Sequence, residues 1–165
     1  MDLDIRLVDE KDIAILDKHL SFGTPGKHQK RVALQKEDKG LYLIAWEGDV
    51  PIGHVFIKLD GPGEQAVKDA VGTFPNLEDL LVVEEKRERG VGTKIMKEVE
   101  RQLCERNYKK LGFGVGIDEL KTIEFYKALG YGKADVEPFK VSWKNEKGEK
   151  DGETCIYLTK DLSCS

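Results

Sequence analysis

The sequence lacks any apolar run near the ~20 residues that a membrane-spanning helix needs, and it lacks an excess of positive charge. Its first residues, Met1 to Asp4, have neither the basic nor the apolar region of a signal peptide. The formal net charge is −4, and Lys and Arg are interspersed among Asp and Glu, so no broad cationic face is available to duplex nucleic acid. These absences predict a cytoplasmic protein that binds neither membranes nor nucleic acid.

Cysteine is also scarce, and its spacing carries no signal. Cys104, Cys155 and Cys164 are odd in number, widely separated and without the paired spacing of a metal site. The simplest interpretation is three unpaired thiols without a catalytic role, and no metal site is predicted. At 165 residues the chain can bury an adequate core without disulfides or metal, so we expect one domain over residues 1–165.

Hydrophobic periodicity and turn residues predict strands alternating with helices. Strands are expected at 5–7, 41–46, 52–59, 76–83, 111–117, 139–143 and 154–158, and helices at 9–20, 28–38, 91–103 and 120–129. The segment 64–75 is compatible with one further short helix. Because the middle of the chain reads strand, helix, strand, helix, two neighbouring parallel strands joined by a right-handed crossover are predicted within a mixed α/β sheet covered by helices.

The most informative segment runs from Leu80 to Thr93, where an apolar strand meets a glycine-containing turn that opens a helix. The first N–H groups of a helix have no internal partner and carry partial positive charge, so they attract anions. Gly90 and Gly92 have no Cβ to keep an anion away from the backbone, and Arg87 and Arg89 add positive charge. Taken alone, this pattern predicts a phosphate site about as well as it predicts an ordinary helix start.

Another glycine pattern, Gly112-x-Gly114-x-Gly116, alternates with apolar residues at the period of a strand. It lacks the third glycine of a dinucleotide-binding turn at the required offset. We therefore interpret it as a bare strand face under a close neighbour, and a helix is the favoured neighbour over a ligand.

In its context, the turn Arg87-x-x-Gly90-x-Gly92 resembles the acetyl-CoA site of the GNAT superfamily of N-acetyltransferases, an Arg/Gln-x-x-Gly-x-Gly/Ala turn after the fourth strand. The run from Glu119 to Tyr131 is similar to the family's second signature, Asn-x-x-Ala-x-x-(apolar)-Tyr-x-x-x-Gly-(aromatic). The resemblance implies a single-domain α/β fold: a mixed, mostly antiparallel sheet with a central parallel strand pair, flanked by helices. Within the superfamily, Leu77 to Val82 is similar to a strand of small-amine acetyltransferases of the spermidine/spermine type.

The resemblance implies acetyl-CoA as the cofactor. Its diphosphate would lie on the amides from Glu88 to Thr93, and its pantetheine arm along the strand at Leu80 to Val82. The residues expected to contact it are Leu80, Leu81, Val82, Arg87, Glu88, Arg89, Gly90, Val91, Gly92, Thr93, Glu119 and Thr122. Glu119 departs from the family's asparagine, and it could instead be structural, as a favourable charge in a helix's first turn capped by Asp118.

A substrate ammonium with a pKa of ~10 is only about one part in a thousand neutral at pH 7, so transfer to an amine requires a base. Glu78 is our candidate, because it lies ~13 Å along the strand from Val82 and strict alternation puts it on the face of Leu80 and Val82. Asp79 would point to the opposite face, and a solvated or salt-bridged Glu78 is the alternative. The resemblance assigns proton donation to the departing CoA thiolate to Tyr126, which could otherwise be a core aromatic residue.

These observations predict an acetyl-CoA-dependent N-acetyltransferase that acts on a primary amine by direct attack in a ternary complex. The expected acceptor is a small molecule, polyamine-like or aminoglycoside-like. Two alternatives remain open at this stage: a non-catalytic acyl-CoA-binding or sensing module, and transfer to a protein amino group. The oligomeric state is also left open by the sequence, and a homodimer through the terminal hairpin would be unsurprising for this superfamily.

Overall fold

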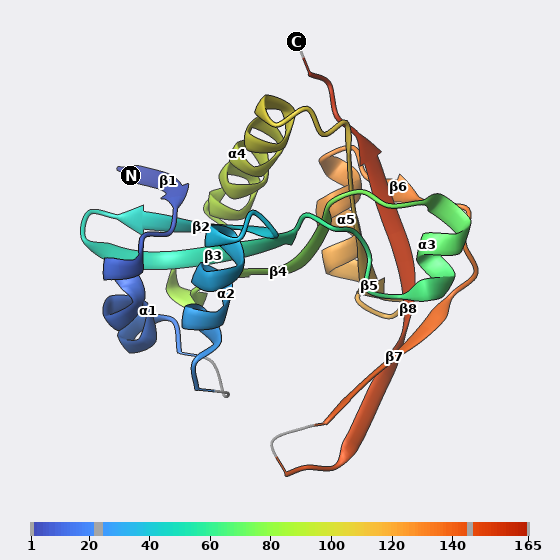
Figure 1. Ribbon diagram of the computed structural model, residues 1–165, viewed down its shortest axis with the longest axis horizontal. Helices are drawn as coiled ribbons and strands as arrows, with labels where there is room; N and C mark the ends of the chain where they lie inside the picture. Colours follow the sequence, from blue (N-terminus) through green and yellow to red (C-terminus); the bar gives the residue numbers. More distant parts are fainter. Residues whose placement is uncertain (1, 22–24, 145–146, 165) are drawn as a thin grey trace.

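The computed structural model describes residues 2–21, 25–144 and 147–164, and within them the chain forms one eight-stranded sheet with helices on both faces (Figure 1). The strand order is β1-β2-β3-β4-β5-β8-β6, and β7 pairs with β8. The strands are β1 (Leu3–Leu7), β2 (Gly40–Glu47), β3 (Val50–Lys58), β4 (Asn76–Val82), β5 (Lys110–Gly116), β6 (Gly132–Lys133), β7 (Phe139–Lys144) and β8 (Lys150–Asp161). The helices are η1 (Glu10–Asp12), α1 (Ile13–His19), α2 (Lys27–Lys36), α3 (Gln65–Val71), η2 (Glu84–Lys86), α4 (Val91–Glu105) and α5 (Leu120–Ala128).

Residues on alternate sides of the central strands enter two separate cores. Leu41, Leu43 and Ala45 of β2 belong to the core that α4 and α5 cover. Tyr42 and Ile44 belong to the core beneath α1 and α2. Figure 1 shows α4 on one side of β2 and β3, with α1 and α2 on the other. Successive side chains of a strand point to opposite faces, so apolar residues at successive positions of β2 enter both cores. Strand β2 is therefore buried on both faces.

The centre of the sheet is a parallel pair that holds together at one point only. Strands β1 to β4 pair antiparallel in sequence order, and β5 pairs antiparallel with β8. Between β4 and β5 the pairing is parallel, and its described register consists of Asn76 opposite Gly112. The predicted mixed, mostly antiparallel sheet with a parallel β4–β5 pair is therefore confirmed. Beyond the contact of Asn76 with Gly112, strands β4 and β5 diverge.

Strand β4 carries a β-bulge that the alternation of its sequence did not indicate. Phe56 of β3 lies opposite Asp79, but the next residue, Ile57, lies opposite Leu77, so Glu78 has no partner on β3. A bulge inserts one residue and breaks the alternation of side chains at that point. The expectation that Glu78 shares the face of Leu80 and Val82 by simple alternation is therefore wrong.

The bare face of β5 is covered by side chains of the sheet and of one loop. A Cβ added to Gly112 would lie 2.7 Å from the rings of Phe74 and Tyr157, and one added to Gly114 would lie 3.2 Å from Phe139. The neighbour expected here was a helix, and that expectation is wrong, because large aromatic residues of β7, β8 and the α3–β4 loop fill the space. The glycines are required because these rings lie against the backbone.

The other predicted elements agree with the structure, including the short helix in 64–75, which is α3. The two-residue strand β6 has no counterpart in the prediction, since two residues carry no period. Asp9 caps the first helical segment as expected, with its side chain accepting from the N–H of Lys11. Among the described residues, no helix has the length and apolar character needed to cross a membrane.

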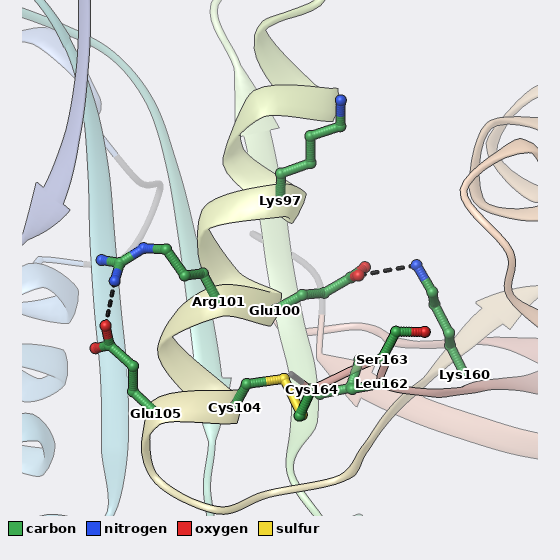
Figure 2. A pocket seen from close by; sticks show the side chains of 9 residues that line it. All are labelled: Lys97, Glu100, Arg101, Cys104, Glu105, Lys160, Leu162, Ser163 and Cys164. Atoms are coloured by element: carbon green, nitrogen blue, oxygen red, sulfur yellow. Dashed lines mark hydrogen bonds and ion pairs between the residues drawn. A yellow bond between two sulfur atoms is a disulfide. The ribbon is translucent and has the colours of Figure 1, made fainter.

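Two of the three cysteines form a disulfide, which corrects the expectation of unpaired thiols. Cys104, near the end of α4, is bonded to Cys164 in the C-terminal tail (Figure 2). The tail reaches α4 because β8 pairs with β5 up to Lys110 opposite Asp161, and because the Leu162 N–H then donates to the Lys109 carbonyl at 2.8 Å. This proximity comes from sheet topology and leaves no mark in cysteine spacing. Disulfides are more usual in oxidising compartments than in the cytoplasm, so the bond does not support the predicted cytoplasmic location. That location stays a prediction.

The disulfide predicts a thiol count and a stability difference. Denatured but unreduced protein should titrate one thiol per chain, that of Cys155, and three after reduction. Closing a loop over a separation of 60 residues stabilises the fold by about 4 kcal/mol in the chain-entropy model. Cys164→Ser should therefore lower Tm by roughly 10 °C in a domain of this size. Three titratable thiols in unreduced protein would contradict the pairing.

Candidate active site

The turn between η2 and α4 presents main-chain donors to one side of β4. Gly90 precedes α4 with φ +80°, and Glu88 has φ +62°, a conformation that non-glycine residues rarely adopt. The first hydrogen bond of the helix runs from the Lys94 N–H to the Gly90 carbonyl at 3.1 Å, and no side chain caps the helix start. The N–H groups of the preceding residues therefore have no intrahelical acceptor.

A cleft of about 530 Å³ opens over these donors, between the end of β4, the turn and α5. We call it the α4 cleft. Ten residues predicted to form the cofactor or catalytic site line it: Leu80, Val82, Arg87, Glu88, Gly90, Val91, Gly92, Thr93, Thr122 and Tyr126. Lys86, Lys121 and Phe125 line it as well and were missed. The sequence could have indicated Phe125, because residues three apart lie on the same face of a helix and Phe125 is three residues after Thr122.

Three of the residues predicted to contact the cofactor do not line the α4 cleft. Leu81 points away from it and is 37% exposed, as alternation requires for the residue between Leu80 and Val82. Arg89 is also absent from its walls. Glu119 is turned back onto its own loop, where its Oε2 accepts from the Gly116 N–H at 3.1 Å.

Glu119 rather than Asp118 precedes α5, and its side chain does not cap that helix. Its hydrogen bond to the N–H of Gly116 instead closes the turn between β5 and α5. This geometry favours the structural interpretation of Glu119, and the expected capping by Asp118 is wrong.

The walls of the α4 cleft combine close packing with positive charge. A Cβ on Gly92 would lie 3.2 Å from the ring of Phe125, so the missing side chain lets the first turn of α4 approach α5. Arg87 folds back over the turn, and its Nε donates to the Val82 carbonyl at 2.8 Å. Free helix-terminal amides, a glycine cradle and cations nearby form an arrangement suited to an anion such as a diphosphate.

Tyr126 stands at the inner wall of the α4 cleft. The residue is 5% exposed, and its ring packs against Phe113 at 4.2 Å and Phe125 at 5.0 Å between centroids. Burial raises the pKa of Tyr126 above its ordinary value, because the phenolate would lose its water. The phenol therefore keeps its proton throughout the neutral range.

A second cleft, of about 280 Å³, lies on the opposite face of the sheet from the α4 cleft. We call it the β8 cleft. Its walls include the carboxylates of Glu64, Glu78 and Glu153 and the rings of Phe139 and Tyr157. The α4 cleft and the β8 cleft are both lined by β4, on either side of its divergence from β5.

Glu78 lies at the bulge of β4, on the wall of the β8 cleft, and its Oε2 accepts from Asn76 Nδ2 at 2.8 Å. Glu78 is exposed as a whole residue, but the surrounding protein partly shields its carboxylate from water and raises the pKa of Glu78, while Lys58 and the Asn76 hydrogen bond act in the opposite direction. Asp79 forms an ion pair of 3.1 Å with Arg31 of α2, and Glu78 also borders the groove of about 510 Å³ that Arg31 lines. The two adjacent carboxylates thus have different hydrogen-bond partners, Asn76 for Glu78 and Arg31 for Asp79.

The free thiol of Cys155 also borders the β8 cleft but is unsuited to nucleophilic attack. The residue is buried, and burial together with the carboxylate of Glu153 raises the pKa of Cys155 to about 11. Because the thiolate is the reactive form, a protonated thiol at neutral pH is a weak nucleophile.

The comparisons with known proteins identify the family. Residues 12–131 match the model of the acetyltransferase (GNAT) family, so the chain belongs to this family. The expected enzyme class, N-acetyltransferase, is thereby confirmed, and membership is consistent with acetyl-CoA as cosubstrate. No curated protein matches the sequence significantly.

Solved structures with low sequence identity share the fold. The ribosomal-protein-S18-alanine N-acetyltransferase of Escherichia coli superposes with a TM-score of 0.69 at 15% identity, covering 99% of this chain and 96% of that one. A GNAT family acetyltransferase from Elizabethkingia anophelis, with acetyl-CoA bound, gives 0.61 at 20% identity and 97% and 98% coverage. The PaiA N-acetyltransferase of Thermoplasma acidophilum, in complex with coenzyme A, gives 0.68 at 14% identity and 98% and 99% coverage.

Proposed function

We propose that the protein transfers the acetyl group of acetyl-CoA to a small primary amine by direct attack in a ternary complex. The observation that carries the proposal is the pair of clefts on opposite faces of the sheet, which flank the divergence of β4 and β5. One cleft is built for an anion and the other for a cation.

The α4 cleft is the proposed cofactor side. The amides from Glu88 to Thr93 would hold the diphosphate, and the main chain from Leu80 to Val82 would hold the pantetheine arm. When bound, acetyl-CoA supplies the thioester and leaves as a thiol. Acetyl-CoA and coenzyme A are bound in the two similar structures from Elizabethkingia and Thermoplasma, which supports this assignment.

Glu78 and Tyr126 are the proposed proton acceptor and donor. A carboxyl group whose pKa is raised toward neutrality is a better base than an ordinary glutamate, and Glu78 would take a proton from the ammonium directly or through water. Tyr126 would move its hydroxyl proton to the leaving sulfur. The protonated state of Cys155 supports direct attack over an acyl-enzyme.

The acceptor is proposed to carry more than one positive charge, as a polyamine-like or aminoglycoside-like molecule does. Three carboxylates in a cleft of about 280 Å³ favour a cationic ligand, and the rings of Phe139 and Tyr157 can contact its alkyl part or its ammonium groups. This acceptor agrees with the likeness of Leu77 to Val82 to the spermidine/spermine-type strand.

Gly92→Asp tests the cofactor side. It adds a negative charge beside the proposed diphosphate, in a space where even a Cβ contacts Phe125. We expect the Kd for coenzyme A, measured by calorimetry, to rise at least about tenfold by repulsion between like charges. Gly92→Asn, which adds the same bulk without the charge, should weaken binding less. Unchanged affinity in a folded Gly92→Asp protein would contradict the assignment.

Tyr126→Phe tests the chemistry, with free CoA thiol followed by a chromogenic disulfide. Loss of a general acid should lower kcat by roughly a hundredfold and leave the affinity for coenzyme A within about a factor of two. Tyr108→Phe, at the other end of α4, is the matched control and should behave as wild type. Tight cofactor binding without amine-dependent thiol release from any acceptor would instead support a non-catalytic acyl-CoA-binding module.

Glu153→Gln tests the acceptor side. We expect KM for diamines and longer polyamines to rise by roughly five- to tenfold, with a smaller rise for a monoamine of the same length, because one carboxylate of the β8 cleft loses its charge. Glu124→Gln, on the exposed face of α5, makes the same change outside both clefts and should leave KM unchanged. If Glu153→Gln left the KM of every amine at its wild-type value, as expected for Glu124→Gln, the polyamine-like acceptor would be refuted. Transfer to protein amino groups alone would refute it as well.

A further inference from the structure

A chain of side-chain hydrogen bonds connects β8 to the bulge of β4. The Tyr157 hydroxyl donates to Asn76 Oδ1, and Asn76 Nδ2 donates to Glu78 Oε2 at 2.8 Å. Asn76 is 6% exposed and Tyr157 2% exposed, so the first of these bonds is buried. Because an ionised carboxylate can only accept, Glu78 takes the nitrogen end of the Asn76 amide, and the amide oxygen is left to accept from the Tyr157 hydroxyl.

The place of Asn76 in the sheet makes this amide rigid. Asn76 is the residue of β4 that lies opposite Gly112 of β5, the last point before the two strands diverge. Its backbone is thus held on one side by β3, opposite Lys58, and on the other by β5. Glu78, two residues further, has no partner on β3 and therefore depends more on its side-chain contacts.

Gly112 makes room for the tyrosine that completes the chain. A Cβ at Gly112 would lie 2.7 Å from the Tyr157 ring and 3.0 Å from its hydroxyl oxygen. Any larger residue at this position would push the ring away from Asn76. One glycine of the Gly112-x-Gly114-x-Gly116 pattern is therefore explained by the hydrogen-bond chain.

We infer that Asn76 and Tyr157 are positioning residues, which hold the Glu78 carboxylate at the divergence of β4 and β5 in the orientation needed to accept a proton from the amine. The inference rests on the proposed role of Glu78 as the base. Without these two hydrogen bonds, a glutamate at a bulge would sample several rotamers. Only some of these rotamers would direct its carboxylate to the divergence of β4 and β5.

Several charged or titratable groups face Glu78 from the elements around it. From β3 and its loop come Lys58 and Asp60, from α2 Arg31, and from β8 Tyr157. Other ionisable residues share the walls of the β8 cleft or of the groove of about 510 Å³ beside α2: Glu64, Glu153, Lys27 and Lys30. Substitutions at Asn76 and Tyr157 leave all of these carboxylates and ammonium groups in place, so they isolate the hydrogen-bond chain.

The first measurement needs neither cofactor nor acceptor. The Glu78 carboxyl of the uniformly ¹³C-labelled protein is titrated by NMR, with its signal assigned by its loss in Glu78→Gln. The Asn76 hydrogen bond lowers the pKa of Glu78, so Asn76→Ala should raise the titration midpoint by roughly half a unit to one unit. Tyr157→Phe keeps the ring but releases the amide of Asn76, and should shift the midpoint in the same direction by less.

The second measurement is the pH profile of kcat/KM for the amine. Because the base acts in its deprotonated form, activity falls as pH falls through the pKa of Glu78, and the acidic limb should move to higher pH by the same interval as the NMR midpoint. We expect kcat to fall roughly tenfold in Asn76→Ala and roughly threefold in Tyr157→Phe. Tyr131→Phe is the matched control, because it removes a tyrosine hydroxyl bound to another carboxylate, Glu100 Oε2 at 2.9 Å.

The outcomes separate the inference from the proposed function. With an active wild-type enzyme, an unchanged Glu78 midpoint and an unchanged acidic limb in both variants would overturn the inference and leave the proposed function intact. If Asn76→Ala does not fold, the isosteric Tyr157→Phe decides by the same two readouts. Absence of acetyl transfer by the wild-type protein to any amine would overturn the proposed function itself, whatever the NMR midpoints.

Discussion

The parallel contact between Asn76 of β4 and Gly112 of β5 is the constraint on which the arrangement of the site depends. Up to this pair the sheet is continuous, and beyond it the two strands separate. Main-chain groups along the diverging edges lose their neighbour within the sheet, and unpaired strand edges readily accept another extended chain. A divergence of this kind makes the two faces of a sheet accessible to each other, so a ligand on one face can meet a ligand on the other.

The divergence is maintained by packing on both faces. On the α4 and α5 face, Gly92 allows the first turn of α4 to approach Phe125, which sets α5 beside the end of β4. On the opposite face, the rings of Tyr157 and Phe139 lie against the bare backbone of β5. Glycines at these positions therefore have the same function on both sides of the sheet, because each lets a large ring pack against a main chain. The packed rings then keep the neighbouring elements apart, so the clefts stay open.

Much of the fold follows from local sequence patterns, because each strand and helix longer than about five residues shows its own period. The turn from Arg87 to Thr93 was likewise predicted from local sequence, and all but one of its residues line the α4 cleft. The bulge at Glu78 could not be predicted, since one inserted residue changes the facing of a side chain without changing composition or period. The Cys104–Cys164 disulfide and the rings over Gly112 and Gly114 depend on where β8 returns to the sheet, which is a property of topology.

The bulge has a consequence for the proposed proton transfers. Had the alternation of β4 continued unbroken, Glu78 would have faced the α4 cleft with Leu80 and Val82, on the same side as Tyr126 and beside an anionic cofactor. A carboxylate in that position would share the cofactor's face with the phenol and could exchange its proton with it. The inserted residue instead borders the β8 cleft, whose walls carry the further carboxylates of Glu64 and Glu153. Proton removal from the amine and proton donation to the leaving sulfur are thereby assigned to opposite faces of the sheet, and the incoming nitrogen would lie between them.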